Sequence, residues 1–169
     1  MNIVLTGFMA TGKTSIGRAI ADISDYTFED TDSMIVTKTG MDINEIFAKY
    51  GEERFREIER ECVAEAAKRD KTVIATGGGV VLDKRNIETL RQNGVIINLD
   101  PDFDVIAERV EKARASRPLM HGESIENIRK RFEARKPFYD NCDRKIHITQ
   151  GKTPDSYAEE ILEIMEEQI

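Results

Sequence analysis

Two patterns of hydrophobic and polar positions alternate along the whole chain. Short apolar runs such as Ile3-Val4-Leu5 are typical of buried strands, and longer segments repeat apolar residues at helical spacing. The predicted strands are 2–6, 26–29, 72–76, 95–99 and 145–149. The predicted helices are 13–23, 33–39, 43–47, 52–69, 84–92, 103–113, 124–139 and 154–167. Strands that alternate with helices indicate an α/β fold with a parallel sheet covered on both faces.

The composition is that of an ordinary globular domain. The chain has 169 residues, of which 40% are hydrophobic and 34% charged, which is enough to bury a sizeable core. We find no internal repeat, no low-complexity segment and no long linker. One domain over residues 1–169 is therefore predicted.

Charge and cysteine content narrow the classes of partner and compartment. The net charge of −7 argues against a general nucleic-acid or membrane-surface binder, since both partners are polyanionic. No basic leader and no apolar run of membrane-spanning length are found, so a cytoplasmic protein is expected. No apolar dimer face is evident, and we expect a monomer. Cys62 and Cys142 lack metal-ligand spacing, and Cys62 is expected to be a buried free thiol.

The segment between the first strand and the first helix has the spacing Gly-x-x-x-x-Gly-Lys-Ser/Thr, from Gly7 to Thr14. Such a turn directs backbone N–H groups into one concavity at the positive end of a helix dipole. Lys13 can then reach the β- and γ-phosphates while the Thr14 hydroxyl binds Mg²⁺. A chance glycine-rich turn is the alternative, and the strand, the spacing, Lys13 and Thr14 together disfavour it. The chain is predicted to bind a nucleoside triphosphate.

Two further segments follow predicted strands, where ligands gather in a doubly wound sheet. In Asp30-Thr31-Asp32, one carboxylate can serve a metal and the other a substrate hydroxyl, although Asp32 could instead cap the next helix. The third strand ends in three glycines, 77–79, where many P-loop proteins have an Asp that supports the metal. Asp30 is the best candidate for that role. The glycines either admit a ligand close to the backbone or form a flexible turn.

Arginines supply the remaining candidates. Arg56 lies at the edge of an apolar helical stripe, within reach of Glu52 and Glu59, as part of an ion-pair ladder or of a site. A basic cluster contains Arg129, Lys130, Arg131, Arg135 and Lys136. Pro137 is expected to end or kink the helix there and to turn Arg135 inward.

The segment 114–122 has no periodicity, breaks at Pro118 and Gly122, and carries Arg114 and Arg117. A short basic loop in a P-loop protein indicates a mobile lid over the phosphates, here at about 113–123, and an ordinary surface turn is the alternative.

With these residues assembled, the chain closely resembles shikimate kinase over nearly its whole length. The matching pieces are Gly7-Phe8-Met9, Gly12-Lys13-Thr14, Asp30-Thr31-Asp32, Gly51-Glu52, Phe55-Arg56, Glu59, Gly77-Gly78-Gly79, Arg117-Pro118-Leu119 and Arg135-Lys136-Pro137. The resemblance implies a nucleoside-monophosphate-kinase-like, three-layer P-loop fold with a five-stranded parallel sheet and a mobile lid. It implies transfer of the ATP γ-phosphoryl group to the 3-hydroxyl of shikimate, with Mg²⁺, on the route to chorismate and the aromatic amino acids.

The resemblance also assigns roles to positions in this sequence. The ATP contacts would be Ala10, Thr11, Gly12, Lys13, Thr14, Ser15, Arg117 and Lys152. Thr14 would ligate Mg²⁺ and Asp30 would support it through water. Asp32 and Gly78 would receive the shikimate hydroxyls, and Arg56 and Arg135 its carboxylate, in an acceptor-binding region at about 32–62. The catalytic residues would be Lys13, Asp32 and Arg117. Because an ordinary Asp is a weak base at neutral pH, Asp32 would orient the hydroxyl and accept its proton late.

Two positions depart from the family pattern. Ala10 stands where the family commonly has a third loop glycine, a replacement that is tolerable if Ala10 keeps a negative φ. Val110 stands in the place of the usual adenine-side arginine, with Arg109 beside it.

Two rival functions differ in class. A gluconate kinase of the same fold would share ATP, Mg²⁺ and a lid. A nucleotide-dependent switch would need a guanine-reading Asn-Lys-x-Asp element, which the sequence lacks.

Overall fold

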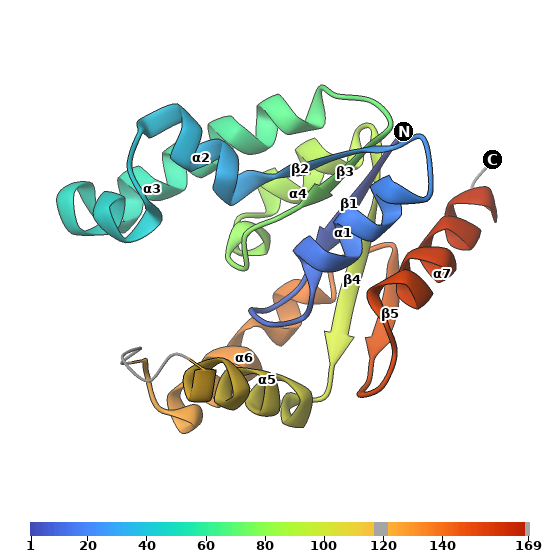
Figure 1. Ribbon diagram of the computed structural model, residues 1–169. Coiled ribbons are helices and arrows are strands. Elements are labelled where there is room, and N and C mark those ends of the chain that lie inside the picture. The colour runs from blue at the N-terminus through green and yellow to red at the C-terminus, as the bar shows by residue number, and fades with distance from the viewer. Residues whose placement is uncertain (117–121, 168–169) are drawn as a thin grey trace.

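The computed structural model describes residues 1–116 and 122–167, with Ser116 described by its backbone alone. One sheet of five parallel strands forms the centre, in the order β2-β3-β1-β4-β5 (Figure 1). The strands are β1 (Asn2–Thr6), β2 (Thr27–Asp30), β3 (Thr72–Ala75), β4 (Gly94–Pro101) and β5 (Arg144–Ile148). The predicted five-stranded parallel sheet is confirmed.

Helices cover both faces of this sheet. The helices are α1 (Lys13–Asp22), α2 (Thr31–Thr39), α3 (Ile43–Ala67), α4 (Lys84–Arg91), α5 (Phe103–Ser116), α6 (Ile125–Tyr139) and α7 (Pro154–Glu167). Helices α1 and α7 pack into the core on one face, while α3, α4, α5 and α6 contribute to the core on the other. The three-layer arrangement therefore agrees with the predicted fold class.

The central strand β1 shows why its sequence reads as an unbroken apolar run. Ile3 and Leu5 face the core that α1 and α7 complete, and Val4 faces the opposite core. Alternate side chains of a strand point to opposite faces, and both faces are covered here, so all of β1 is buried and its three central residues, 3–5, are apolar.

Three details of the structure differ from what the sequence predicted. The helices predicted at 43–47 and 52–69 form one run, α3, whose helical geometry breaks at Gly51 with φ 82° and ψ 174°. Helix α6 ends at Tyr139 as predicted, but it passes through Pro137, where an end or a kink was expected. A short 3₁₀ helix, η1 (Val80–Leu82), follows the glycine segment and was not predicted.

Helices α2 and α3 have a small core of their own beside the sheet. It consists of buried Ile35, Ile46, Phe55, Ile58 and Cys62. Cys62 is fully buried and free, as predicted. Within the described ranges, no helix combines the length and apolar character that crossing a membrane requires. The α2–α3 unit projects from one side of the sheet and α5–α6 from the other, and both border the carboxyl end of β1 (Figure 1).

Candidate active site

The loop between β1 and α1 has the geometry that the glycine spacing predicts. Gly12 caps α1 with φ 98°, a left-handed conformation that glycine adopts at no steric cost. The Lys13 ammonium donates hydrogen bonds to the carbonyls of Gly7 at 2.6 Å and Phe8 at 2.9 Å. Burial lowers the pKa of Lys13 from 10.5 to about 8, although the charges of Asp32 and Asp30 oppose the shift. The loop thus holds a cation whose proton is unusually easy to lose.

Ala10 does not meet the condition of a negative φ. Its φ is +62°, so a residue with a Cβ occupies the left-handed region at a cost of roughly 1–2 kcal/mol. Its carbonyl oxygen accepts a hydrogen bond from Arg109 Nη1 at 2.8 Å. Arg109 on α5 therefore stabilises the conformation that Ala10 adopts.

The two oxygens of the Asp30 carboxylate have different hydrogen-bond partners. Its Oδ1 accepts the backbone N–H groups of Asp32 at 2.8 Å and Ser33 at 3.1 Å, and so caps α2. Its Oδ2 accepts the Thr14 hydroxyl at 3.3 Å. Because Asp30 is the cap, the alternative of Asp32 as the N-cap is wrong, and the Asp32 side chain is free for another role.

Asp32 lies in the first turn of α2 and faces the glycine segment. A Cβ built on Gly77 would lie 2.6 Å from Asp32 Oδ1. Burial raises the pKa of Asp32, and the nearby Asp30 charge raises it further, against the opposing charges of Lys13 and Arg56. This carboxylate is therefore a stronger base than the ordinary Asp assumed from the sequence.

Each of the three glycines admits a different side chain. Besides Asp32 at Gly77, Arg135 Nη1 lies 3.4 Å from the Cβ position of Gly78, and Arg56 Nη1 lies 2.4 Å from that of Gly79. A methyl group at 77 or 79 would overlap the charged group beside it. The three predicted acceptor side chains, which come from α2, α3 and α6, thus meet along one segment of backbone.

The segment is not a flexible turn. The N–H of Gly77 donates to the Thr31 hydroxyl at 3.0 Å, and the carbonyl of Gly78 accepts from the Tyr139 hydroxyl at 2.7 Å. The Gly77 carbonyl also accepts a hydrogen bond from the Val80 N–H at 3.1 Å, at the start of η1. The flexible-turn alternative is therefore wrong.

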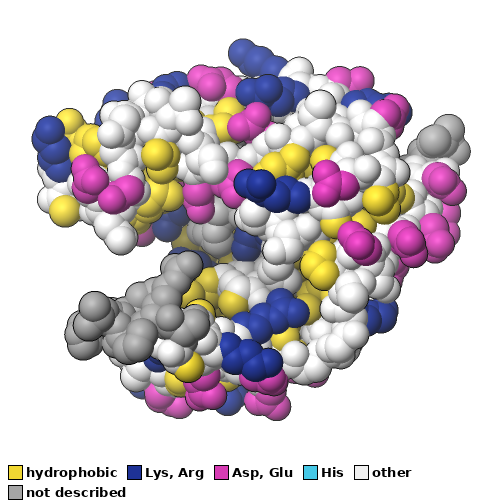
Figure 2. Space-filling view, in the orientation of Figure 1, with side chains coloured by type: hydrophobic (Ala, Val, Ile, Leu, Met, Phe, Trp, Pro, Cys, Tyr) yellow, Lys and Arg dark blue, Asp and Glu magenta, His cyan; other side chains and the backbone are white. Residues whose placement is uncertain are grey.

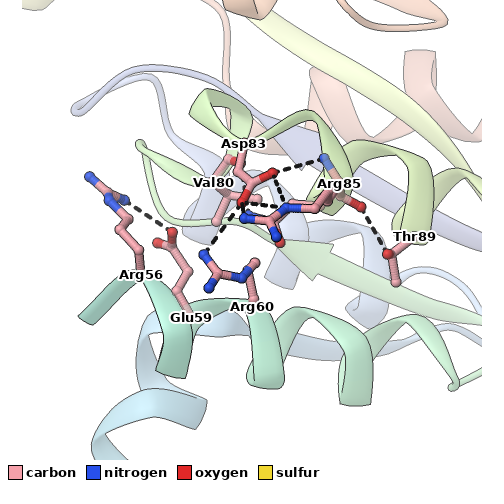
Figure 3. Close-up of polar contacts among 8 residues, drawn as sticks. Arg56, Glu59, Arg60, Val80, Asp83, Arg85 and Thr89 are labelled. Carbon is pink, nitrogen blue, oxygen red and sulfur yellow. Dashed lines mark hydrogen bonds and ion pairs between the residues drawn. The ribbon is translucent and has the colours of Figure 1, made fainter. Parts of the chain in front are cut away.

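Arg56 is held by a buried carboxylate. Its Nη1 lies 3.0 Å from Oε1 of Glu59, which is 2% exposed (Figure 3). Exposed Glu52 lies 3.6 Å from Nη2. Burial raises the pKa of Glu59, and the Arg56 charge opposes that shift. One turn further along α3, Arg60 pairs with Asp83 after η1 (Figure 3). Arg56 is thus part of an ion pair, and its guanidinium group also lies beside Gly79. The two interpretations from the sequence, an ion-pair ladder and a site residue, therefore do not exclude each other.

Several of these groups, although not Arg56 or Glu59, line one pocket of about 300 Å³ at the carboxyl end of the sheet. The lining includes Phe8, Met9, Lys13, Thr14, Asp30, Asp32, the segment 75–79, Arg131 and Arg135. Figure 2 shows the molecule hollowed between its two projecting parts, with Lys and Arg side chains inside the hollow. A pocket that gathers acids and cations beside a P-loop suits transfer of a phosphoryl group between two anions.

A second pocket of about 340 Å³ adjoins the other side of the P-loop. Its lining includes Ala10, Thr11, Gly12, Ser15, Arg109, Lys152 and Pro154. Val110 is buried in the core, so Arg109 is the arginine on this face of α5. Lys152 is placed with the other predicted ATP contacts, and Arg117 lies outside the described residues.

Four residues in or beside the two pockets carry no clear sequence signal. Thr31 and Tyr139 bond the glycine segment, Arg131 lines its pocket, and Arg109 bonds Ala10. Arg131 resembles any member of a solvated basic cluster until the packing of α6 is known. Only its i,i+4 spacing to Arg135 on α6 could have indicated that both face the same way.

The family model for shikimate kinase matches residues 9–166. A shikimate kinase of Caldicellulosiruptor bescii is 44% identical over 164 residues, covering 96% of this chain and 94% of that protein. The chain belongs to the shikimate kinase family. A shikimate kinase of Caldanaerobacter subterraneus subsp. tengcongensis is 46% identical over 162 residues, or 95% of this chain and 94% of the relative.

Solved structures of other proteins support the same family assignment. A shikimate kinase from Acinetobacter baumannii in complex with shikimate has a TM-score of 0.87 at 34% identity, over 99% of this chain and 93% of that one. A gluconokinase from Sinorhizobium meliloti 1021 reaches a TM-score of 0.61 at 17% identity, which shows a shared fold alone. The protein is an ATP-dependent shikimate kinase, and the gluconate kinase alternative is disfavoured.

Proposed function

We propose that this shikimate kinase transfers the ATP γ-phosphoryl group to the 3-hydroxyl of shikimate with the residues of the two pockets. The convergence of Asp32, Arg56 and Arg135 on the three glycines, beside Lys13 and Thr14, supports this assignment most. It places two guanidinium groups and one carboxylate where an anionic polyol could be held next to a P-loop.

On the nucleotide side, the amides from Ala10 to Ser15 bind the phosphates at the N-terminus of α1. Lys13 exchanges the carbonyls of Gly7 and Phe8 for phosphate oxygens. The second pocket receives the adenosine part, with adenine between Arg109 and Pro154 and with Lys152 at its edge. Arg117 approaches the transferring group from a lid at about 113–123.

Thr14 and Asp30 suit Mg²⁺, because a hydroxyl and one carboxylate oxygen lie 3.3 Å apart and both are hard oxygen donors. Thr14 would bind the ion directly and Asp30 through water, since Mg²⁺ usually retains several waters beside one or two carboxylates and substrate phosphates. The ion neutralises charge on the β- and γ-phosphates when bound.

On the acceptor side, Arg56 and Arg135 hold the shikimate carboxylate, and Gly78 and Asp32 receive its hydroxyls. Glu59 keeps Arg56 in place. The raised pKa of Asp32 makes it a better acceptor for the 3-hydroxyl proton, which leaves as the phosphorus–oxygen bond forms. Since the transition state of phosphoryl transfer is loose, orientation remains the larger contribution of Asp32.

We also propose one domain over residues 1–169, an acceptor-binding region at about 32–62, a monomer, and a cytoplasmic location without nucleic-acid or membrane partners. The small α2–α3 core supports the boundaries of the acceptor region, because it folds that segment as a unit around Arg56.

A coupled assay of ADP release tests the proposal. ATP with shikimate should give rapid turnover, while ATP with gluconate and ATP alone should give background. Equal rates with gluconate, or release without an acceptor, would contradict it.

A further inference from the structure

Tyr139 ends α6 and contacts the centre of the glycine segment. Its hydroxyl donates to the Gly78 carbonyl at 2.7 Å, and its side chain is nearly buried, with 5% of the residue exposed. The ring packs in the core with Phe8, Phe132 and Val80. The hydroxyl is thus the polar end of an otherwise apolar anchor.

The bond fixes a particular peptide group. The Gly77 N–H is already held by Thr31 of α2, and Tyr139 of α6 holds the Gly78 carbonyl from the other side. Gly78 therefore sits between two hydrogen-bonded peptide groups, each bonded to a different helix. The rotation of the peptide bearing the Gly78 N–H is restricted without any side chain on the glycine itself.

Tyr139 also lies close to Arg135. The two residues are four apart on α6, so they share one face of the helix. Arg135 Nη1 and Tyr139 Oη lie 3.4 Å and 3.8 Å from the same point, the Cβ position of Gly78. Burial raises the pKa of Tyr139 and the Arg135 charge opposes it, so the hydroxyl remains protonated and able to donate at neutral pH.

We infer that Tyr139 is a positioning residue for the acceptor, which holds the Gly78 peptide and the Arg135 guanidinium in the relative placement that shikimate binding needs. The inference rests on the proposed acceptor site. A residue that merely stabilised α6 would not affect the acceptor more than the nucleotide.

Tyr139→Phe tests this, because it keeps the ring and removes one hydroxyl. A buried carbonyl left without its donor should raise the shikimate KM by roughly five- to thirty-fold, with the ATP KM within about twofold. Thr72→Val is the matched control. The Thr72 hydroxyl also donates to a backbone carbonyl, that of Asp70 at 3.1 Å, and the residue is buried at the start of β3, away from the pocket. It should lower Tm with both KM values unchanged.

Two further measurements distinguish a failure of the role inferred for Tyr139 from a failure of the proposed acceptor site. Arg135→Ala is assayed in parallel, and the double variant with Tyr139→Phe should raise the shikimate KM by less than the product of the single effects. Amide hydrogen exchange at 77–79 should be faster in Tyr139→Phe and should slow again with shikimate.

If Tyr139→Phe lowers Tm like Thr72→Val but leaves the shikimate KM unchanged while Arg135→Ala raises it, the positioning role is refuted and the acceptor site stands. A normal shikimate KM in Arg135→Ala would overturn the acceptor site and this inference with it.

Discussion

The two sides of the active site are built in different ways. The proposed phosphate-binding part of the nucleotide side is one continuous segment, from Gly7 to Ser15, whose binding groups would be mainly backbone amides. The acceptor side is assembled from α2, α3, the glycine segment and α6, and its binding groups are charged side chains. A continuous segment can be recognised from spacing alone, whereas an assembled site requires the packing of helices that are far apart in sequence.

This difference also predicts how each side responds to substitution. Backbone amides survive a change of side chain, and Ala10 in a position that favours glycine illustrates that tolerance. On the acceptor side each charge has its own partner, as Arg56 has Glu59, so a single substitution removes one specific function.

Asp32→Asn should have the largest effect, because it removes the proton acceptor on the acceptor side and leaves the P-loop intact. We expect kcat to fall by roughly 10²- to 10⁴-fold with little change in the ATP KM. Steady-state kinetics measure it, and the exposed Asp104→Asn on α5 is the control. Tm should not fall, because burial already disfavours the Asp32 charge. Turnover near that of the unmodified enzyme would exclude Asp32 from the chemistry.

Arg135→Ala should come second. Loss of a charged hydrogen-bonded contact, worth about 1.5–3 kcal/mol, should raise the shikimate KM by roughly ten- to hundred-fold and leave the ATP KM nearly unchanged. Lys130→Ala removes an exposed cation from the same helix and should change neither value. An equal rise in both KM values would mean that the two sides are not separable.

Lys13 gives the nucleotide side a pH dependence of its own. Phosphates favour the ammonium form, so above its pKa of about 8 the free enzyme must take up a proton when ADP binds. Affinity should therefore fall by up to about tenfold per pH unit above pH 8, and should be nearly constant below it with respect to this group. Calorimetry at pH 7.5 and 9, in buffers of different ionisation enthalpy, measures the uptake.

Lys13→Arg provides the reference for that experiment, because arginine stays protonated over this range. Proton uptake at pH 9 that persists unchanged in Lys13→Arg would assign the effect to another group.

Ala10→Gly should have the smallest effect. It relieves the left-handed strain, partly offset by the greater freedom of glycine in the unfolded chain, so Tm should rise by no more than roughly 2–4 °C. Ala19→Gly inside α1 is the matched control and should lower Tm. A lower Tm in Ala10→Gly, measured by thermal unfolding, would show that the greater freedom of glycine in the unfolded chain outweighs the relief of strain.

Much of the fold could be predicted from the sequence because its determinants are local. The strands buried on both faces are continuous apolar runs, and the break at Gly51 falls where two helices were predicted. Helix ends were less certain: α2 begins at Thr31, two residues before its predicted start, because Asp30 caps it.

The site, like the fold, has parts that a local pattern predicts and parts that depend on tertiary contacts. Lys13 and Thr14 follow from spacing, while the choice between capping and substrate binding for Asp32 required knowing that Asp30 is the cap. The conformation of Ala10 and the pairing of Thr31 with Gly77 depend on neighbours from other elements, which no local pattern encodes.

The shared carboxylate of Asp30 limits how this enzyme can be re-engineered. One oxygen anchors the start of α2 and the other faces Thr14, so Asp30→Ala would remove a helix cap worth about 1 kcal/mol together with a charge beside the nucleotide. Asp30→Asn keeps an oxygen for the cap, removes the charge, and replaces the oxygen that faces Thr14 with an NH2 group. An engineer who wants to retune ion preference without loosening the helix that carries Asp32 has this one conservative replacement to start from.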